Sequence, residues 1–224
     1  MHIHYKTLSK ILLICVCMVA FAACQRQQSY SVSPSESIPA HPVFKPLPPH
    51  ASPQLKQLIE AAVAQAGVTK GYDPSYLKLK YPDGDVPLET GVCSDVVVRA
   101  FRKAGIDLQK EVHEDMLRAW SDYPKRWGAI RPDTNIDHRR VPNLMTYFTR
   151  HGTSLLPNNN PDDYLPGDVV AWDLGGGIDH IGIITNFTSE SAKRCLIVHN
   201  IGSGVRVEDV LFAWTIKGHY RYFR

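Results

Sequence analysis

Residues 91–101 have the sequence GVCSDVVVRAF, and the fold is best inferred outward from this stretch. After Cys93 the apolar residues recur at the spacing of one helical stripe until Gly105, which can stop a helix at its C-terminus. The β-branched run Val96 to Val98 lowers helix propensity and would equally suit the start of a strand. The pattern predicts a helix from Ser94 to Ala104, with Cys93 continuing its apolar stripe backwards.

The position of Cys93 suggests a chemical role for its sulfur. A helix N-terminus has unpaired N–H groups and about half a positive charge, so it favours the thiolate form, which attacks carbonyl groups. The amides of the first turn, beginning near Ser94, would be available as oxyanion donors. The alternative is a buried cysteine that only fills space in the core. Cys93 is thus a candidate nucleophile that needs a nearby base.

Two histidines lie in segments with the alternating pattern of strands. Residues 177–185 contain His180, residues 194–200 contain His199, and a polar turn region separates the two segments. If they form a hairpin closed at their nearest ends, His180 faces His199 directly, with Cβ atoms about 4.5–5.5 Å apart. A slip of one residue would place Asn200 there instead.

The two histidines would complete a candidate catalytic group. His180 would act as the base, and either His199 or Asn200 would orient its ring and select its tautomer. Gly182, two residues after His180 on the same strand face, leaves room for another backbone or a substrate. We therefore expect Cys93 and the two imidazoles to meet in the folded protein.

Four motifs follow one another along the chain: GVCSDVVVRAF (91–101), LPGDVVAW (165–172), DHIGIIT (179–185) and IVHNIGSGVRV (197–207). In this order they resemble the NlpC-type branch of the papain-like cysteine peptidases, from roughly Tyr72 to the C-terminus. The resemblance implies a papain-like fold, cleavage of amide bonds in peptidoglycan stem peptides through a thioester acyl-enzyme, and no cofactor. It also implies roles in the order nucleophile, base and orienting residue for Cys93, His180 and His199.

Three other runs resemble more closely a bacterial family catalogued only as a domain of unknown function: YDPSYLKLKYPDGDVP (72–87), VHEDM (112–116) and PDTNIDHRRVPNL (132–144). That closer resemblance implies no reaction. The NlpC-type family has a tyrosine near the oxyanion. Tyr81 matches it by its spacing from the cysteine, and Tyr72 is nearly as good a candidate.

Three charged residues are candidates for substrate binding. Arg139 and Arg140 lie together in a polar segment, and guanidinium groups bind carboxylates in a bidentate manner. Peptidoglycan stem peptides are rich in carboxylates. Asp179, next to the expected base, is the third candidate. The alternative for the arginines is a solvated loop with surface ion pairs.

Residues 52–224 are long enough for one domain with a sizeable core. Helix signals precede a run of strand signals, which predicts the α+β class, with N-terminal helices packed on an antiparallel sheet and the nucleophile at the N-terminus of a central helix. Besides the helix after Cys93, helices are predicted at 53–66, 108–120 and 142–150. Strands are predicted at 168–172, 178–185, 194–200, 205–208 and 218–223.

The N-terminus has the features of an export signal. Lys6 and Lys10 precede an apolar run, residues 11–23, that is too short to span a bilayer as a permanent helix. The end of that run resembles a bacterial lipoprotein processing site, at which Cys24 would become the acylated N-terminus. Residues 1–24 are therefore predicted to be a lipoprotein-type signal peptide. Simple secretion or an uncleaved anchor are the alternatives.

Residues 25–51 are rich in proline and serine, so they cannot bury enough apolar surface to order themselves and are predicted to form a semi-stiff tether. A tether after a lipid anchor suits an enzyme whose substrate is the cell wall. We expect a periplasmic monomer that is anchored to the membrane by lipid. Gln25, directly after the cysteine, favours the outer membrane.

Charge balance and cysteine spacing argue against nucleic acid, zinc and a disulfide in this protein. The chain has 25 basic and 22 acidic residues, and subtracting Lys6 and Lys10 leaves 23 against 22, which argues against nucleic acid as a partner. No zinc-binding spacing is present. An oxidising periplasm would permit a disulfide between Cys93 and Cys195, but not if His199 contacts Cys93, because Cys195 lies about 13 Å further along the strand.

Two functions compete with a hydrolase. An acyltransferase or thioesterase on the same fold would need an apolar groove beside Cys93. A non-catalytic cell-wall-binding lipoprotein would have the two imidazoles turned away from the sulfur or the cleft blocked.

Overall fold

The computed structural model describes residues 43–189 and 193–223, which belong to the compact unit Pro34–Arg224. The predicted signal peptide 1–24, its candidate lipidation site Cys24 and residues 25–42 of the predicted tether lie outside the described residues. The helices are α1 (Pro53–Val63), α2 (Cys93–Lys103), α3 (Leu108–Arg118) and α4 (Val141–His151), with short 3₁₀ turns η1 (Trp120–Asp122), η2 (Arg126–Gly128), η3 (Asp137–Arg139) and η4 (Pro161–Asp163). The strands are β1 (Val43–Phe44), β2 (Thr153–Leu155), β3 (Val169–Asp173), β4 (Asp179–Thr188), β5 (Cys195–Asn200), β6 (Val205–Glu208) and β7 (Thr215–Arg221).

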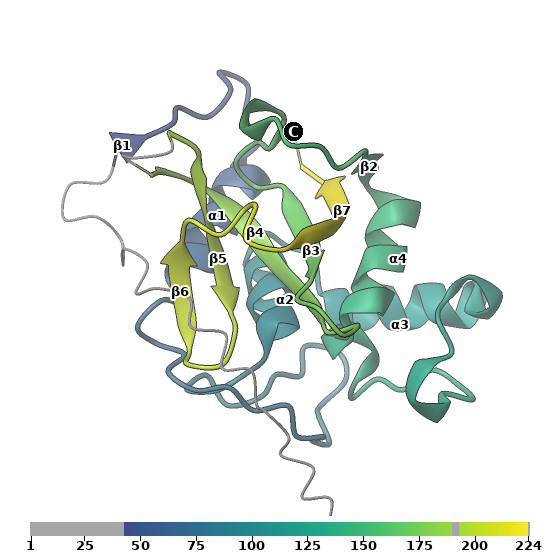
Figure 1. Ribbon diagram of the computed structural model, residues 1–224. Helices are drawn as coiled ribbons and strands as arrows, with labels where there is room; N and C mark the ends of the chain where they lie inside the picture. The colour runs from purple at the N-terminus through teal and green to yellow at the C-terminus, as the bar shows by residue number, and fades with distance from the viewer. Residues whose placement is uncertain (1–42, 190–192, 224) are drawn as a thin grey trace, which may run out of the picture. The chain divides into compact units, whose positions relative to one another are not determined.

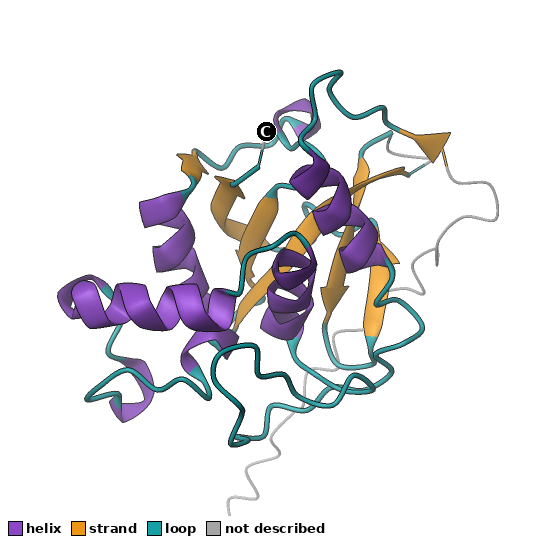
Figure 2. Ribbon diagram, turned by 180° about the vertical axis from the view of Figure 1, so that it is seen from behind, coloured by secondary structure: helices purple, strands orange, loops and turns teal. Residues whose placement is uncertain are grey.

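The described strands form one antiparallel sheet with the order β2-β7-β3-β4-β5-β6, and β1 pairs with β4 outside this path. Helices α1 and α2 lie against one face of the sheet (Figure 1, Figure 2). The predicted class is confirmed: the fold is α+β, with N-terminal helices packed on an antiparallel sheet and Cys93 at the N-terminus of the central helix.

The core divides into two clusters. The larger joins the helices to the sheet, where Val97 and Phe101 of α2 are fully buried with Ile181 and Val198. The smaller is centred on Trp172, whose indole Nε1 donates a 2.9 Å hydrogen bond to the carbonyl of Leu211. Successive residues of a strand point to opposite faces, so β4 and β5 contribute alternate residues to the two clusters.

Helix α2 forms despite its β-branched run because the whole run is buried. Val96, Val97 and Val98 are each no more than 2 % exposed, so burial of apolar surface outweighs their low helix propensity. Asp95 closes the N-terminus, where its carboxylate accepts a 2.7 Å hydrogen bond from the N–H of Val92. This half of a capping box places Cys93 in the first turn.

Helix α1 begins as its sequence predicts. Ser52 is the N-cap and its hydroxyl accepts a 3.2 Å hydrogen bond from the N–H of Leu55, while Pro53 occupies the first helical position. The helix ends at Val63, three residues before the predicted end, and Gly67 then adopts a φ of 83° in the turn that follows.

The last part of the predicted tether belongs to the folded unit. Val43 and Phe44 pair with Thr188 and Phe187 of β4, and the two phenylalanine rings contact each other edge-on at 5.0 Å. A short apolar pair gains both ladder hydrogen bonds and an aromatic contact at the edge of β4. Composition averaged over 25–51 could not reveal this local pairing.

The register of β4 and β5 differs from the predicted hairpin. Ile183 faces Val198 and Ile184 faces Ile197, so the observed register is displaced by two residues, and the direct opposition predicted for the histidines is wrong. A further shift occurs between Ile184 and Thr188. Because side chains alternate with a period of two, a two-residue displacement keeps each side chain on its predicted face.

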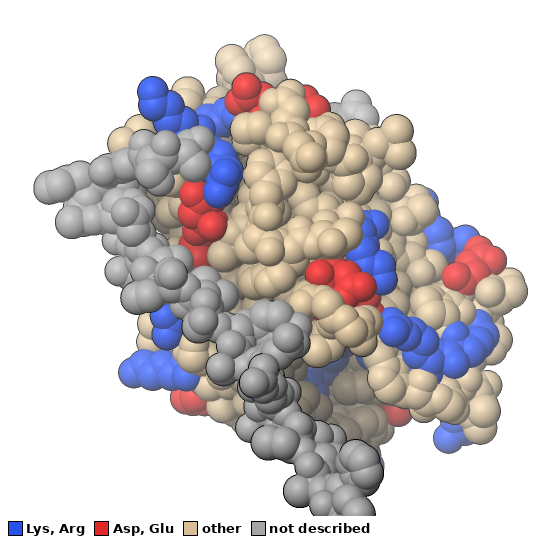
Figure 3. Space-filling model, in the orientation of Figure 1, with Lys and Arg blue, Asp and Glu red and all other residues tan. Residues whose placement is uncertain are grey.

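None of the helices in the described ranges is long and apolar enough to cross a membrane. On the face seen in Figure 3, basic and acidic side chains of the described residues are interspersed. This agrees with the near balance of charge in the sequence.

Candidate active site

Cys93 is the first residue of α2 and only 4 % exposed. The N–H of Ile181 in β4 donates a hydrogen bond to its sulfur, as do the N–H groups at the start of α2. Burial nevertheless raises the pKa of the Cys93 thiol to about 12, and the nearby Asp95 carboxylate acts in the same direction. The expectation that the helix N-terminus would hold a partial thiolate is therefore wrong for this state, because desolvation outweighs the helix dipole.

The two imidazoles form a hydrogen-bonded chain. His180 Nε2 lies 2.9 Å from His199 Nδ1, and His199 Nε2 lies 3.0 Å from Glu208 Oε2. The rings of His180 and His199 meet edge-on at 5.1 Å, and Trp172 and Trp214 pack against them. The predicted proximity of the histidines is thus present, although it is diagonal and not directly across the ladder.

Gly182 makes the diagonal contact possible. A Cβ atom at this position would lie 2.8 Å from Ile197 Cγ2, 2.9 Å from the carbonyl oxygen of Val198 and 3.2 Å from the Cβ of His199. The space predicted for a backbone or a substrate is therefore filled by β5 itself. Glycine allows His199 to lie over β4 and reach the ring of His180.

The sulfur approaches β4 at Ile181, whose side chain packs in the larger cluster with α2, whereas the neighbouring His180 packs against Trp172 of the smaller cluster. Cys93 contacts the backbone of Ile181, and His180 is the residue before it. Among residues 43–189 and 193–223, no hydrogen bond joins the Cys93 sulfur to either imidazole. Burial lowers the pKa of His180 well below its usual value, and His199 adds to this effect, so His180 is neutral at pH 7.

A cleft of about 280 Å³ adjoins the sulfur. Tyr72 lines it, and burial together with the neighbouring Cys93 and Asp95 raises the pKa of its phenol. Arg140 lies across the cleft with its guanidinium 4.8 Å from the centre of the exposed Trp127 ring. The cleft is thus bordered by a thiol, a phenol, a cation and an aromatic face.

Asp179 also lines the cleft and is paired with two cations. Its carboxylate forms a short ion pair with Arg126, and Lys217 Nζ lies 3.3 Å away. The negative charge of Asp179, directly before His180, is therefore compensated by its own ion pairs, so the carboxylate is not free for a substrate.

Arg139 is not available to a substrate in the way that the sequence suggested. Its Nε and Nη2 lie 2.9 and 3.0 Å from the two carboxylate oxygens of Asp95. The same guanidinium donates to the carbonyls of Ser75 and Asp73. Because four of its N–H directions are used in the interior, Arg139 is a structural residue that also forms part of the cleft wall.

The other predicted site residues, Ser94, Tyr81 and Asn200, make contacts outside the expected catalytic group. Ser94 is buried and its hydroxyl donates a 2.7 Å hydrogen bond to the carbonyl of Arg139, so the side chain is used in packing. Tyr81 does not line the cleft; its ring contacts His113 edge-on at 5.3 Å. Within the described part of the chain, Asn200 forms no hydrogen bond with His180. It donates instead to the carbonyls of Gly71 and Gly91, at 3.1 and 3.0 Å.

Residues 59–222 match the model of a family described as "Domain of unknown function (DUF1287)". The chain belongs to the DUF1287 family. It is 48 % identical over 189 residues to "Uncharacterized protein YijF" of Escherichia coli strain K12. This alignment covers 82 % of this chain and 92 % of that protein.

Three solved structures are similar to this DUF1287 chain. NlpC1 from Trichomonas vaginalis aligns with a TM-score of 0.42 and 14 % identity over 81 % of this chain. A protein similar to a lipoprotein, of the NLP/P60 family, from Staphylococcus aureus aligns with a TM-score of 0.38 and 12 % identity over 83 % of this chain. This chain spans only 48 % and 45 % of their lengths. An N-acetylmuramoyl-L-alanine amidase from Bacteroides uniformis aligns with a TM-score of 0.42 and 16 % identity, and the alignment covers 77 % of this chain and 100 % of the amidase.

Glu208 is the residue of this DUF1287 site that sequence reasoning missed. It ends the correctly predicted strand β6, where Arg206 faces His199 and Glu208 faces Ile197. Glu208 is therefore diagonal to His199 on the same face of the sheet. A buried acidic residue at the end of the alternating run VRVE was the available signal, and only the pairing of β5 with β6 gives it a partner.

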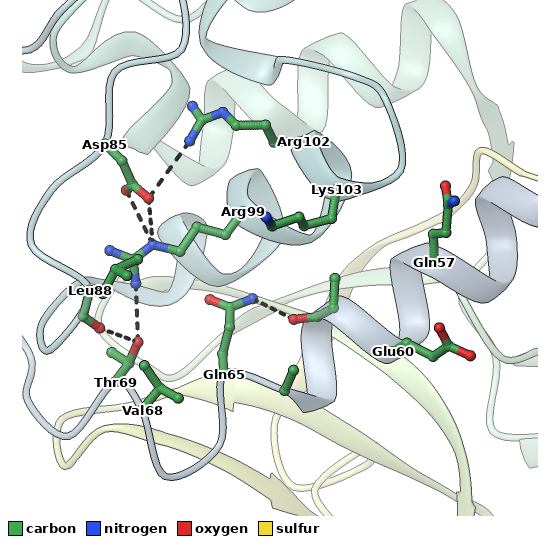
Figure 4. Close-up of a pocket in the computed structure, with 12 residues that line it drawn as sticks. Gln57, Glu60, Gln65, Val68, Thr69, Asp85, Leu88, Arg99, Arg102 and Lys103 are labelled. Atoms are coloured by element: carbon green, nitrogen blue, oxygen red, sulfur yellow. Dashed lines mark hydrogen bonds and ion pairs between the residues drawn. The ribbon is translucent and has the colours of Figure 1, made fainter.

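A larger hollow of about 650 Å³ lies between α1 and α2 and contains none of the predicted site residues (Figure 4). Its polar groups bind one another. Arg99 pairs with Asp85 at 2.9 Å and donates to Thr69 at 3.1 Å, and it also binds carbonyls at residues 86, 87 and 90. This network anchors the irregular segment 64–92, which precedes Cys93, to α2.

Both described cysteines of this DUF1287 domain, Cys93 and Cys195, are free thiols, and they belong to different core clusters. Within the described ranges, no group of three or more histidine, cysteine or acidic side chains is arranged to hold a metal ion.

Proposed function

We propose that this protein is a cysteine hydrolase that cleaves amide bonds in peptidoglycan stem peptides through a thioester acyl-enzyme. One observation carries the proposal. The sulfur of Cys93, at the start of α2, is hydrogen-bonded to the N–H of Ile181, and the preceding residue, His180, heads the hydrogen-bonded chain that continues through His199. A thiol at a helix N-terminus, and an oriented imidazole on the residue next to the one that the thiol contacts, are the groups that a nucleophile and its base require.

The hydrogen bonds leave one atom to act as the base. His180 Nε2 is engaged by His199, so Nδ1 is the nitrogen that would take the thiol proton. As this proton leaves, the sulfur of Cys93 bonds to the carbonyl carbon, and N–H groups at the start of α2 receive the oxyanion. His180 then protonates the leaving amine as the C–N bond breaks. Water hydrolyses the thioester and the thiol is restored.

The resting site holds a neutral thiol and a neutral imidazole. Burial raises the pKa of Cys93 and lowers that of His180, so neither group is charged near pH 7. Proton transfer would then accompany attack instead of preceding it. The hydrogen bond between the two groups would form when substrate enters, as catalytic contacts commonly tighten only in the complex.

The cleft supports a peptide substrate with a carboxylate. Arg140 supplies a cation for that group, and Trp127 offers an exposed ring. Stem peptides carry carboxylates. The resemblance of the motifs to NlpC-type peptidases supports the same substrate class.

The proposed location is the periplasm, with the protein held by lipid at Cys24 and favouring the outer membrane. The support is the sequence of the leader, residues 1–24, and the proline-rich segment after it. An anchored monomer would reach the cell wall through this tether. Mass spectrometry of the membrane-extracted N-terminal peptide would test the lipid directly, because an unmodified Cys24 would exclude it.

The test of the reaction is mass analysis of purified muropeptides incubated with protein under reducing conditions. Wild-type protein should shorten the stem peptides, and the Cys93→Ala variant should not. The Cys195→Ala variant is the matched control and should cleave like wild type, since Cys195 lies in the other core cluster. Unaltered muropeptides in every sample would remove the hydrolase proposal.

A second candidate is a wall-binding protein without chemistry, favoured by the 4 % exposure of Cys93 and by the missing hydrogen bond to His180. In that case wild type and Cys93→Ala would bind muropeptides equally and cleave none. The Arg140→Met variant would weaken that binding.

A further inference from the structure

We propose that Glu208 is a positioning residue that selects the tautomer of His180 by acting through His199, an inference that rests on the proposed function of the site. Glu208 is not among the residues that line the cleft beside Cys93. Its carboxylate lies at one end of a hydrogen-bonded chain whose other end is the His180 ring, bonded to His199 through its Nε2.

The chain is short, dry and made of adjacent strands. His180 is 2 % exposed, His199 1 % and Glu208 5 %. Strands β4, β5 and β6 each contribute one member, and β5 lies between the other two. Arg206 Nη1, 3.9 Å from Glu208 Oε1, provides positive charge near the carboxylate. Such burial keeps water from exchanging with the hydrogen bonds and gives each one a defined direction.

An ionised carboxylate can only accept hydrogen bonds. With Glu208 ionised and His199 neutral, His199 carries its proton on Nε2, where it meets Glu208, and its Nδ1 is left as an acceptor. His180 must then carry its proton on Nε2 to satisfy that acceptor. The remaining nitrogen, His180 Nδ1, keeps its lone pair. This is the form of the imidazole that can take a proton from a thiol.

Reversing the end of the chain would disable the base. If the group at position 208 donated a hydrogen bond to His199 Nε2, then His199 would carry its proton on Nδ1 and donate it to His180 Nε2. The proton of His180 would be forced onto Nδ1, where the lone pair is needed. The charge at position 208 therefore decides, through His199, which nitrogen of His180 is basic.

The spectroscopic test uses two-bond ¹H–¹⁵N correlation NMR of the full-length, histidine-labelled protein at pH 7. Difference spectra of His180→Asn and His199→Asn variants assign the two rings. Both rings should be protonated on Nε2 in wild type. In Glu208→Gln, whose amide can donate as well as accept, this single pattern should be replaced by a mixture. A wild-type His180 protonated on Nδ1, or identical tautomers in wild type and Glu208→Gln, would overturn the proposal.

The kinetic test compares the same variants on muropeptides. Glu208→Gln should lower kcat by about 10- to 100-fold while KM changes by less than about twofold, because substrate contacts are untouched. Glu208→Asp, which keeps the charge, should recover part of the loss. Glu89→Gln makes the same chemical change at an exposed site and should have no effect.

The two tests separate the two proposals. The NMR pattern does not depend on turnover, so a wild-type protein that cleaves nothing but shows the expected tautomers would refute the hydrolase and leave the role of Glu208 in the chain. Cleavage by wild type with kcat unchanged in Glu208→Gln would refute the role of Glu208 and leave the hydrolase. If Glu208→Gln does not fold, the NMR spectrum of the wild type alone tests the role of Glu208, and a His180 protonated on Nδ1 would refute it.

Discussion

Asp95 and Arg139 form a buried bidentate ion pair, with 2.9 Å between Nε and Oδ1 and 3.0 Å between Nη2 and Oδ2. The pair ties the first turn of α2 to η3. Because the same carboxylate also accepts from the N–H of Val92, it sets the backbone directly before Cys93. One ion pair therefore joins the wall of the cleft to the start of the nucleophile's helix.

Removing one partner of this pair should be strongly destabilising. Asp95→Ala leaves a buried guanidinium without its counter-ion, and we expect a loss of about 3–5 kcal/mol in the free energy of unfolding measured with urea. The double variant Asp95→Ala, Arg139→Met should recover part of the loss, since no unpaired charge remains. Glu114→Ala removes an exposed partner of Lys110, 4.0 Å away, and should cost less than about 1 kcal/mol. Equal losses in the two single variants would contradict the structural role of Arg139.

Gly182→Ala should be costly because its Cβ would overlap β5. The new atom would lie 2.8 Å from Ile197 Cγ2 and 2.9 Å from the Val198 oxygen, so we expect a loss of about 1–3 kcal/mol in urea unfolding. Gly176→Ala is a control of the opposite kind. It has no atom within 4 Å of the new Cβ but a φ of 65°, and backbone strain alone should cost about 1 kcal/mol. A neutral Gly182→Ala would show that His199 does not need this close approach.

Alkylation of Cys93 by iodoacetamide should be slow at pH 7 and rise about tenfold per pH unit up to pH 10, because its pKa is raised to about 12 and only the thiolate reacts. Peptide mass spectrometry gives the rate at each pH. Cysteine in free solution, with a pKa of about 8.5, should instead level off above pH 9. A plateau for Cys93 between pH 7 and 9 would show that the thiolate is stabilised in the free protein after all.

His138 and Asp137 should give opposite pH dependences to stability. Burial lowers the pKa of His138 from 6.5 to about 3, so the unfolded chain binds a proton there that the folded protein excludes, and stability falls as pH drops below 6.5. Burial raises the pKa of Asp137 from 3.8 to about 6, so its contribution is present below pH 3.8 and lost as pH rises through 6.

The two variants should therefore change the acid sensitivity in opposite directions. Between pH 7 and pH 4, the free energy of unfolding should fall less in His138→Asn than in wild type, and more in Asp137→Asn. Urea titrations at the two pH values measure both. Matching slopes in all three proteins would mean that neither group is perturbed in the folded state.

Helices and strands were predictable because their apolar spacing is local. The stripe after Cys93 predicted α2, and the capping pair Ser52 and Pro53 predicted the start of α1. Alternation in residues 177–185 and 194–200 predicted two strands with both histidines on one face. Their register was not predictable, because the pairing shifts between Ile184 and Thr188 and local alternation does not specify such a shift.

The candidate site was only partly predictable for the same reason. Residue type and spacing made Cys93, His180 and His199 the candidates, and periodicity was enough to put the two histidines on one face of the sheet. The partner of His199 was missed, since Glu208 reaches it only once β6 pairs with β5. The internal role of Arg139 is not visible in the sequence because its counter-ion, Asp95, lies in a distant segment of the chain.

By itself the amino-acid order determined the fold class, the element that begins with Cys93 and the face of the sheet that holds the imidazoles, all of which follow from repeats of two or 3.6 residues. Tertiary structure alone decided that the thiol is protonated, that Tyr72 and not Tyr81 borders the cleft and that Asn200 holds Gly91 in place. These properties depend on desolvation and on contacts between segments far apart in the chain, which no local pattern encodes.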